Sequence, residues 1–248
     1  MNTTLEHQLN HRSIRKFKDQ PLTPEQLDAI LAAASHTPTY TFLQAASIIG
    51  VTDKAKQQKL AEICKQPYVA EAAYLFVIVA DMNRNARIAA AQGVPAEGMG
   101  RAERFFPTFY DATLMTMNMV TAAESMGLGC VILGSINNDM QATIELLGLP
   151  EYTFPCLGLA VGIPDQEPAL KPRLPRDVVF MENTYQPIAD PLTTLADYDA
   201  IVHQYYDLRD TKKPVDTFTA QMAARMAAVP DASPSLLETL QRQGFLKE

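Results

Sequence analysis

A short basic segment near the start of the chain offers the clearest chemistry in the sequence. Residues His11-Arg12-Ser13-Ile14-Arg15 place two guanidinium groups, a hydroxyl and an imidazole within five positions. Arginine presents a planar fork of hydrogen-bond donors that matches the oxygens of a phosphate group. The segment therefore indicates an anion site with a ligand phosphate as the leading candidate, and a solvated basic turn is the alternative.

The rest of the chain offers few catalytic groups of its own. His7, His36 and His203 are isolated in the sequence and are interpreted as surface or packing residues. No serine lies in a nucleophile-elbow sequence, and no pair of acids stands apart from the charged background. A second cationic stretch, Lys171-Pro172-Arg173, comes much later, with hydroxyl and amide residues between the two. That combination favours a bound cofactor that performs the redox chemistry itself.

Composition argues against several classes of function. The 248 residues carry a net charge of -7 and a sequence pI near 5.2, which argues against a nucleic-acid partner. The three cysteines, Cys64, Cys130 and Cys156, have neither metal-ligand nor redox-motif spacing, so we expect free thiols and no metal site. No apolar run reaches the ~20 residues of a membrane span, and residues 1–4 lack the features of a signal peptide. We therefore expect a cytoplasmic protein with no membrane partner.

Periodicity predicts helices and strands in irregular alternation. Thr23 can cap a helix that begins at Pro24, where Gln26 completes a capping box. Apolar runs predict strands at 44–51, 74–80, 130–135 and 153–162, and the second of these is expected to be central and covered on both faces. Residues 82–104 are expected to be irregular. The helix at 138–147 is expected to be capped by Asn137 or Asn138. Further helices are predicted at 5–9, 53–64, 111–126, 191–208, 216–228 and 233–243.

Together these elements predict an α+β fold: one domain over residues 1–248, with a central sheet of about four or five strands and a helical C-terminal extension over 191–248. The helix at 111–126 is long and poor in charge, so we expect it to be buried on most sides, either in a dimer interface or in the core of one subunit. Gly127-Leu128-Gly129 lies at the end of this helix and lacks a third glycine, which argues against a Rossmann site.

The sequence resembles the flavin-dependent nitroreductase family, and within it the oxygen-insensitive NADPH nitroreductases and NADPH–FMN oxidoreductases. The matching stretches follow the family order and lie at residues 11–15, 42–44, 122–129, 170–175 and 182–187. The basic segment and the Lys-Pro-Arg-Leu-Pro stretch, at this separation, form the most specific part of the resemblance.

The resemblance implies an intertwined homodimer of nitroreductase-like fold, with a mixed or antiparallel sheet, that binds FMN non-covalently at the subunit interface. It assigns Arg12, Ser13, Lys171 and Arg173 to the FMN phosphate and ribityl chain, with His11 lining the same pocket. The chemistry agrees, because a dianionic phosphate requires several cations and a hydroxyl.

The resemblance also implies which residues contact the redox end of the flavin. Arg15 is assigned to the pyrimidine edge, where a cation stabilises the negative charge of the reduced ring. Leu133-Gly134-Ser135 matches the backbone that passes the ring, so Arg15, Gly134 and Ser135 form the expected catalytic set. Thr39, Thr41 and Gln66 match flavin contacts that the partner subunit is expected to supply, and the amide of Gln44 is suited to the ring edge or ribityl hydroxyls.

The implied reaction is ping-pong: a nicotinamide reduces the flavin and leaves, and a nitroaromatic, a quinone or a flavin then takes two electrons. Arg209, Lys212 and Lys213 match residues that bind the 2′-phosphate of NADPH, but lysine lacks the guanidinium fork. Either NADPH or NADH therefore remains open as co-substrate, and so does the physiological acceptor. Two alternatives are an NAD(P)H:flavin reductase and a non-catalytic flavin-binding protein.

Overall fold

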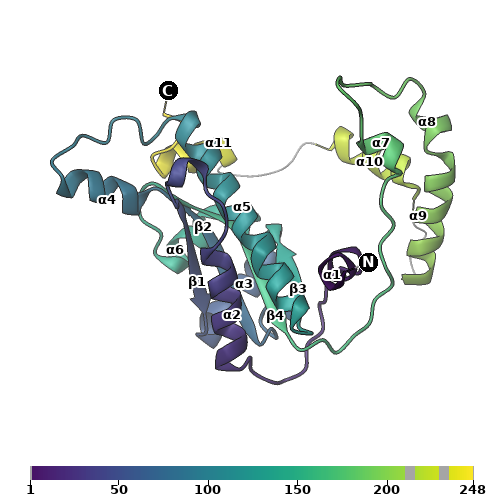
Figure 1. The fold of residues 1–248 in the computed structure, drawn as a ribbon, viewed down its shortest axis with the longest axis horizontal. Helices are drawn as coiled ribbons and strands as arrows, with labels where there is room; N and C mark the ends of the chain where they lie inside the picture. The colour runs from purple at the N-terminus through teal and green to yellow at the C-terminus, as the bar shows by residue number, and fades with distance from the viewer. Residues whose placement is uncertain (1, 210–215, 229–234, 248) are drawn as a thin grey trace. The chain divides into compact units, whose positions relative to one another are not determined.

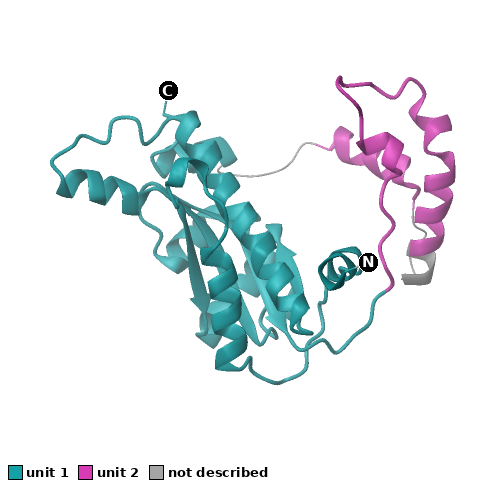
Figure 2. Cartoon of the chain, in the orientation of Figure 1, with its two compact units in different colours: residues 1–168, 232–248 teal, residues 169–231 magenta. Residues whose placement is uncertain are grey.

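The computed structural model describes residues 2–209, 216–228 and 235–247 (Figure 1). The chain divides into two compact units, one formed by residues 1–168 and 232–248 and the other by residues 169–231 (Figure 2). Each unit is described by itself below. The prediction of a single domain with an extension from residue 191 stays a prediction.

A four-stranded antiparallel sheet forms the centre of the first unit, in the order β1-β2-β4-β3. The strands are β1 (Ala46–Val51), β2 (Tyr74–Asp81), β3 (Gly129–Leu133) and β4 (Thr153–Gly162). β2 is central, as its apolar sequence predicts. Its alternate residues enter two different cores, because successive side chains of a strand point to opposite faces. Phe76, Ile78 and Ala80 belong to one core, and Leu75, Val77 and Val79 belong to the other.

Two helices cover one face of the sheet and pack on each other (Figure 1). They are α2 (Pro24–Ser35) and α5 (Ala102–Ser125), the longest described helix with 24 residues. The predicted capping box of α2 is present, with reciprocal hydrogen bonds between Thr23 and Gln26. On the other face, α3 (Lys54–Cys64) buries Leu60, Ala61 and Cys64.

The remaining elements of this unit are short. The helices are α1 (Thr3–Leu9), α4 (Asn83–Ala91), α6 (Met140–Leu147) and α11 (Leu236–Arg242), and the 3-10 turns are η1 (Tyr40–Phe42), η2 (Pro67–Val69) and η3 (Gly134–Asn137). Among the described residues, no helix is both long enough and apolar enough to cross a membrane. Cys64, Cys130 and Cys156 are free and buried, as expected from their spacing.

Several local predictions were wrong. Residues 82–104 are not irregular throughout, because α4 occupies Asn83–Ala91 and the glycines that suggested a loop all follow it. α5 begins at Ala102 rather than at Asp111 and continues through Pro107, at the cost of one helical hydrogen bond. α6 is capped by Asp139 instead of Asn137 or Asn138, since residues 134–137 are already taken up by η3.

Only one face of α5 is covered within the described chain, so its predicted burial on most sides, which allowed for a dimer interface, stays a prediction. Buried residues such as Ala112, Met119 and Ala123 lie on the face that meets the sheet. The opposite face exposes a row of large apolar side chains: Phe106, Tyr110, Leu114 and Met117. In the described chain, α5 is therefore a core helix along one face and is uncovered along the other.

The second unit is helical and has a small core of its own. It contains α7 (Arg176–Val179), α8 (Pro191–Thr194), α9 (Ala196–Arg209) and α10 (Phe218–Ala227), so the single helix predicted at 191–208 is divided at Leu195. Leu195, Tyr198 and Val202 are buried together. Residues 171–175 form neither helix nor strand, as their prolines predict.

Candidate functional site

The basic segment lies along the edge strand of the sheet. The amide of Ile14 donates to the carbonyl of Cys130 at 2.9 Å, and Ser13 forms an isolated parallel bridge to the same residue. The Ile14 side chain is buried against Gly129, where a β-carbon would come within 2.6 Å of it. Ile14 is buried, whereas Ser13 and Arg15 on either side of it are only partly buried.

A carboxylate on α5 holds the imidazole of the segment. Nδ1 of His11 lies 2.6 Å from Oε1 of Glu124, and the Cys130 thiol donates to the same oxygen at 3.6 Å. Burial, together with the charge of Glu124, raises the pKa of Cys130. This arrangement fixes the start of the basic segment at the C-terminal end of α5.

Arg12 retains unused hydrogen-bonding capacity. Its Nη1 donates to the carbonyl of Asn10 at 3.1 Å, while its Nε is buried and has no partner among the described residues. Arg12 and Glu124 line a cavity of about 240 Å³. A buried donor without an acceptor is costly, so Arg12 is suited to an anionic ligand.

Three of the predicted site residues converge on one polar cluster, although they come from separate segments. Oε1 of Gln66 accepts hydrogen bonds from the Tyr68 hydroxyl at 2.5 Å and from Ser135 Oγ at 3.3 Å. Burial raises the pKa of Tyr68, and the neighbouring Arg15 guanidinium partly offsets this through a hydrogen bond and its charge. We call Arg15, Gln66, Tyr68 and Ser135 the Arg15 cluster.

Two features next to the Arg15 cluster bear on the predicted flavin site. Burial raises the pKa of Cys64, and a hydrogen bond with Ser135 opposes that effect. Leu133 is buried at the end of β3, whereas Gly134 is exposed, and a β-carbon on Gly134 would meet no atom of the described residues within 4 Å. The backbone at Gly134 therefore borders open space beside the cluster.

Thr39, Thr41 and Gln44 lie elsewhere, in the connection between α2 and β1. Thr39 and Gln44 line a cavity of about 610 Å³ together with residues of α2 and α4. Within the described residues, no hydrogen bond joins this connection to the Arg15 cluster. Gln66 was expected to come from the partner subunit with the two threonines, but in the single chain it contacts Ser135.

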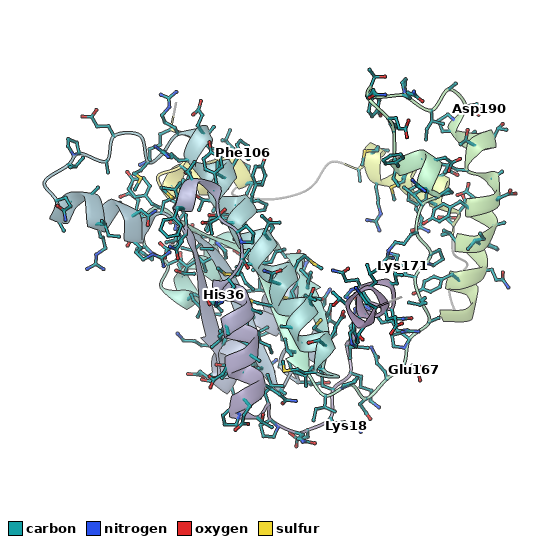
Figure 3. The ribbon with its side chains drawn as sticks, viewed as in Figure 1. Lys18, His36, Phe106, Glu167, Lys171 and Asp190 are labelled. Carbon is teal, nitrogen blue, oxygen red and sulfur yellow. The ribbon has the colours of Figure 1, made fainter. Side chains whose placement is uncertain are left out.

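The second cationic stretch belongs to the second unit. Lys171 (labelled in Figure 3) and Arg173 are exposed, and Arg173 Nη1 donates to the carbonyl of Lys171 at 3.3 Å. Both line a cavity of about 490 Å³ within that unit. Their predicted sharing of one phosphate with Arg12 and Ser13 stays a prediction. Arg209 ends α9, and Lys212 and Lys213 lie outside the described residues.

The described residues fit an anionic, partly aromatic ligand better than a metal ion. They contain no group of histidines, cysteines and acids that could hold a metal, whereas Arg12 has a buried donor without a partner and Arg15 is a cation beside Tyr68. Sequence reasoning missed Tyr68 and the role of Glu124. A hydroxyl two residues after Gln66, and an acid within a matching stretch, were the only signals available.

Comparison with known proteins gives a consistent result over nearly the whole chain. The model of the Nitroreductase family matches residues 9–163, and that of its C-terminal domain matches residues 171–248. An oxygen-insensitive NADPH nitroreductase of Salmonella typhimurium is 40% identical, over 99% of both chains. An FMN reductase (NADPH) of Bacillus subtilis is 38% identical, over 100% of both. The solved structure of the NfrA1 nitroreductase from B. subtilis superposes with a TM-score of 0.93 at 38% identity and covers 99% of this chain and 100% of that one.

Proposed function

The chain belongs to the nitroreductase family, and on that premise we propose that it is an FMN-dependent NAD(P)H oxidoreductase that passes two electrons to nitroaromatics, quinones or related acceptors. One observation carries the proposal. Arg15, Gln66 and Ser135 come from separate segments and meet in one polar cluster beside the open space at Gly134. FMN would supply the chemistry there, by accepting a hydride from the nicotinamide and passing electrons to the acceptor.

The phosphate end of FMN is assigned to the start of the basic segment. The unpartnered Nε of Arg12 and the partly exposed Ser13 beside it support this assignment, because a phosphate oxygen would satisfy the buried donor. His11, held by Glu124, lines the same region. Lys171 and Arg173 are assigned to the phosphate on the sequence resemblance alone.

The redox end is assigned to the Arg15 cluster. The guanidinium of Arg15 would stabilise negative charge on the pyrimidine edge of the flavin, and Tyr68 holds that guanidinium in place. Gln66 accepts two hydrogen bonds through Oε1, which leaves its Nε2 as a donor for a ligand. Gly134 would allow a flat ring to approach the backbone, with Ser135 beside it and Leu133 fixing the strand end.

We further propose that the functional molecule is a homodimer that uses the exposed row on α5. Phe106, Tyr110, Leu114 and Met117 follow one face of the helix at spacings of three and four residues. An apolar row of this length is unusual on a surface that faces water alone. In such a dimer, we expect Thr39, Thr41 and Gln44 to reach the flavin of the partner subunit.

NADPH is the proposed electron donor, with NADH as the alternative. The names of both relatives described above specify NADPH. The residues assigned to its 2′-phosphate are Arg209, Lys212 and Lys213. The ping-pong order and a cytoplasmic location are likewise proposals, the latter supported by three cysteines that remain free thiols.

Purified protein mixed with each nicotinamide and a nitro compound or quinone tests the function directly. The expected result is a yellow protein whose bound flavin is bleached by NADPH and recovers its colour when the acceptor is added. Protein that binds no FMN when it is supplied contradicts the whole proposal. If neither nicotinamide bleaches the bound flavin, both enzyme functions are excluded and the protein is a flavin-binding protein without turnover.

A second candidate function is reduction of free flavin, because one relative of nearly equal similarity is named an FMN reductase. The two activities share the same site and differ only in the acceptor. Steady-state kinetics at one NADPH concentration rank the acceptors. The values of kcat/KM are compared for free FMN, a quinone and a nitroaromatic. A kcat/KM for free FMN above those for the quinone and the nitroaromatic favours the flavin reductase.

A further inference from the structure

The connection between α2 and β1 has a strained backbone. Thr41, Phe42 and Gln44 have φ angles of 46°, 62° and 47°, in the left-handed region that residues other than glycine rarely adopt. Thr41 is β-branched, which makes the conformation still less favourable. Phe42 is 82% exposed, so burial of its ring does not hold the backbone in this shape. Some other interaction must hold it.

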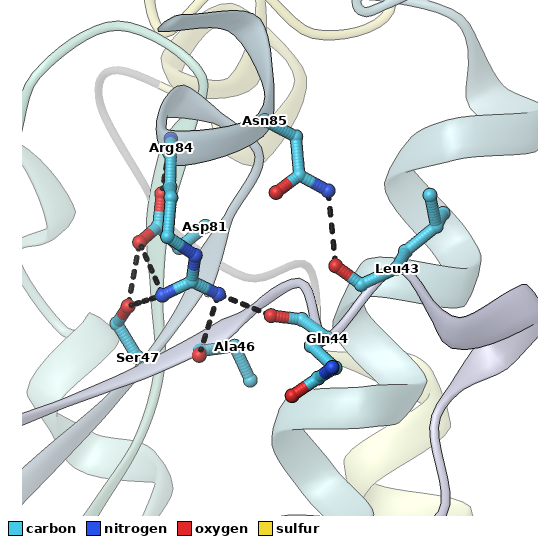
Figure 4. Close-up of polar contacts among 7 residues, drawn as sticks. All are labelled: Leu43, Gln44, Ala46, Ser47, Asp81, Arg84 and Asn85. Carbon is cyan, nitrogen blue, oxygen red and sulfur yellow. Dashed lines mark hydrogen bonds and ion pairs between the residues drawn. The ribbon is translucent and has the colours of Figure 1, made fainter. Parts of the chain in front are cut away.

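Side chains at the start of α4 contact the carbonyl groups of this connection (Figure 4). Nη2 of Arg84 donates to the carbonyl of Gln44 and, at 3.4 Å, to that of Ala46. Nδ2 of Asn85 donates to the carbonyl of Leu43 at 3.0 Å. Consecutive residues of α4 thus bind three carbonyl groups between Leu43 and Ala46, and one of these belongs to the left-handed residue Gln44.

Arg84 is itself held by the end of β2. Asp81 Oδ1 accepts from the Arg84 amide at 3.1 Å, and Oδ2 lies 3.7 Å from Nη1. Ser47 completes the set, because its hydroxyl donates to Asp81 Oδ2 at 2.5 Å and accepts from Arg84 Nη1 at 3.1 Å. These contacts fix the guanidinium plane in the position that Figure 4 shows.

The geometry distinguishes this arrangement from an ordinary surface ion pair. The Arg84 donors are directed at backbone carbonyls and a hydroxyl, at distances no longer than 3.4 Å, while the carboxylate lies farther away. A planar fork can serve several acceptors at once, whereas the ammonium of a lysine is a single point of charge. The opposite end of the connection is held by Asp111, whose Oδ1 accepts from the Tyr40 amide at 2.8 Å.

We propose that Arg84 is a positioning residue that clamps residues 39–46 in the strained conformation and thereby presents Thr39, Thr41 and Gln44 to the flavin. This inference rests on the proposed function, because those three residues are assigned to flavin there. Without the clamp, Thr41, Phe42 and Gln44 relax toward right-handed conformations. The flavin contacts then lose their preset geometry, while the sheet and α5 remain intact.

Two measurements on the full-length chain test the clamp. The first is the rate of chymotrypsin cleavage after Tyr40 and Phe42, identified by mass spectrometry, in flavin-free protein. The second is the dissociation constant of FMN, from titration of the same protein. Arg84→Ala and Arg84→Lys are compared with Arg87→Ala, an exposed arginine of the same helix that makes no hydrogen bond within the described residues.

The expected result is cleavage several-fold faster in Arg84→Ala, an FMN dissociation constant raised roughly tenfold, and little rescue by lysine. Arg87→Ala should match the wild type in both measurements. Unchanged cleavage in Arg84→Ala overturns the clamp, and faster cleavage with unchanged FMN affinity overturns the positioning role. Full rescue by lysine also overturns it, since charge alone would then suffice.

Two further outcomes keep this inference separate from the proposed function. Wild-type protein that binds no FMN contradicts the proposed function, while the cleavage rates still decide whether the clamp exists. A raised KM for NADPH but not for NADH in Arg84→Ala, with unchanged cleavage, makes Arg84 a ligand of the nicotinamide phosphate and overturns the clamp.

Discussion

At the residue scale, the proposed role of Arg15 requires its guanidinium to contact both the phenol of Tyr68 and the flavin. Replacing it by alanine should weaken FMN binding by at least tenfold, because hydrogen bonds to charged groups contribute about 1.5–3 kcal/mol. Titration of flavin-free protein measures this. Lys16→Ala is the matched control, since Lys16 carries the same charge one position later and pairs with Asp165 on the surface. Tight, normally reducible FMN in Arg15→Ala would remove Arg15 from its proposed role.

Asp111 provides a test through pH. Burial raises the pKa of this carboxyl above 3.8, although the amides of Tyr40 and Ala45 lower it in part, and its Oδ2 has no partner in the described chain. A raised pKa means that the folded state binds the proton more tightly than the unfolded state. Wild-type protein should therefore gain stability relative to Asp111→Asn as the pH falls through the folded pKa toward 3.8.

Urea unfolding of the wild type and Asp111→Asn, at neutral pH and at successively lower pH, measures that difference. Only the difference between the two proteins is used, because other carboxyls titrate in both. If the wild type instead loses stability relative to the variant on acidification, the amide hydrogen bonds outweigh burial and the folded pKa is lowered.

At the element scale, the start of α2 depends on one side chain. The Thr23 hydroxyl accepts from the Gln26 amide at 3.2 Å, and the Gln26 side chain accepts from the Thr23 amide at 3.0 Å. Thr23→Ala should lower the free energy of unfolding by about 1 kcal/mol. Thr23→Ser keeps the hydroxyl and should stay close to the wild type in denaturant unfolding. Equal stability of the alanine and serine variants would contradict a role for the cap.

The elements that the sequence predicted best are those in which local and tertiary signals agree. The capping box of α2 and the apolar run of β4 each needed only their own residues, and β4 occupies Thr153–Gly162 as predicted. α4 was missed because the glycines at 93, 98 and 100 were taken to describe the whole of 82–104. For α5 the sequence left a dimer interface and a core as alternatives, since apolar side chains have the same pattern whether they meet a core or a second subunit.

The candidate site was predictable only in part for a similar reason. Arg15, Gln66 and Ser135 were each named from the sequence, but their meeting depends on η3 lying beside Gln66, directly before η2, and on Arg15 reaching Tyr68. Tyr68 and Arg84 act through hydrogen bonds to residues distant in the sequence or to backbone carbonyls. Such contacts depend on geometry and leave no local pattern.

At the scale of the whole molecule, the proposed dimer can be tested through α5. Leu114 lies at the middle of the exposed row, and Leu114→Glu places a charge where a partner would have to bury it. Sedimentation velocity should show a dimer for the wild type and a shift toward monomer for the variant. Leu237→Glu on α11 makes the same change at a similarly exposed leucine and should leave the dimer unchanged.

The same pair of variants connects assembly to the cofactor. If the partner subunit supplies Thr39, Thr41 and Gln44 to the flavin, the monomeric Leu114→Glu protein should also lose FMN, measured as flavin absorbance per chain after gel filtration. Far-UV circular dichroism establishes that the variant remains folded. A folded monomer that keeps its full complement of FMN would assign every flavin contact to one subunit, and a wild type that sediments as a monomer would contradict the dimer itself.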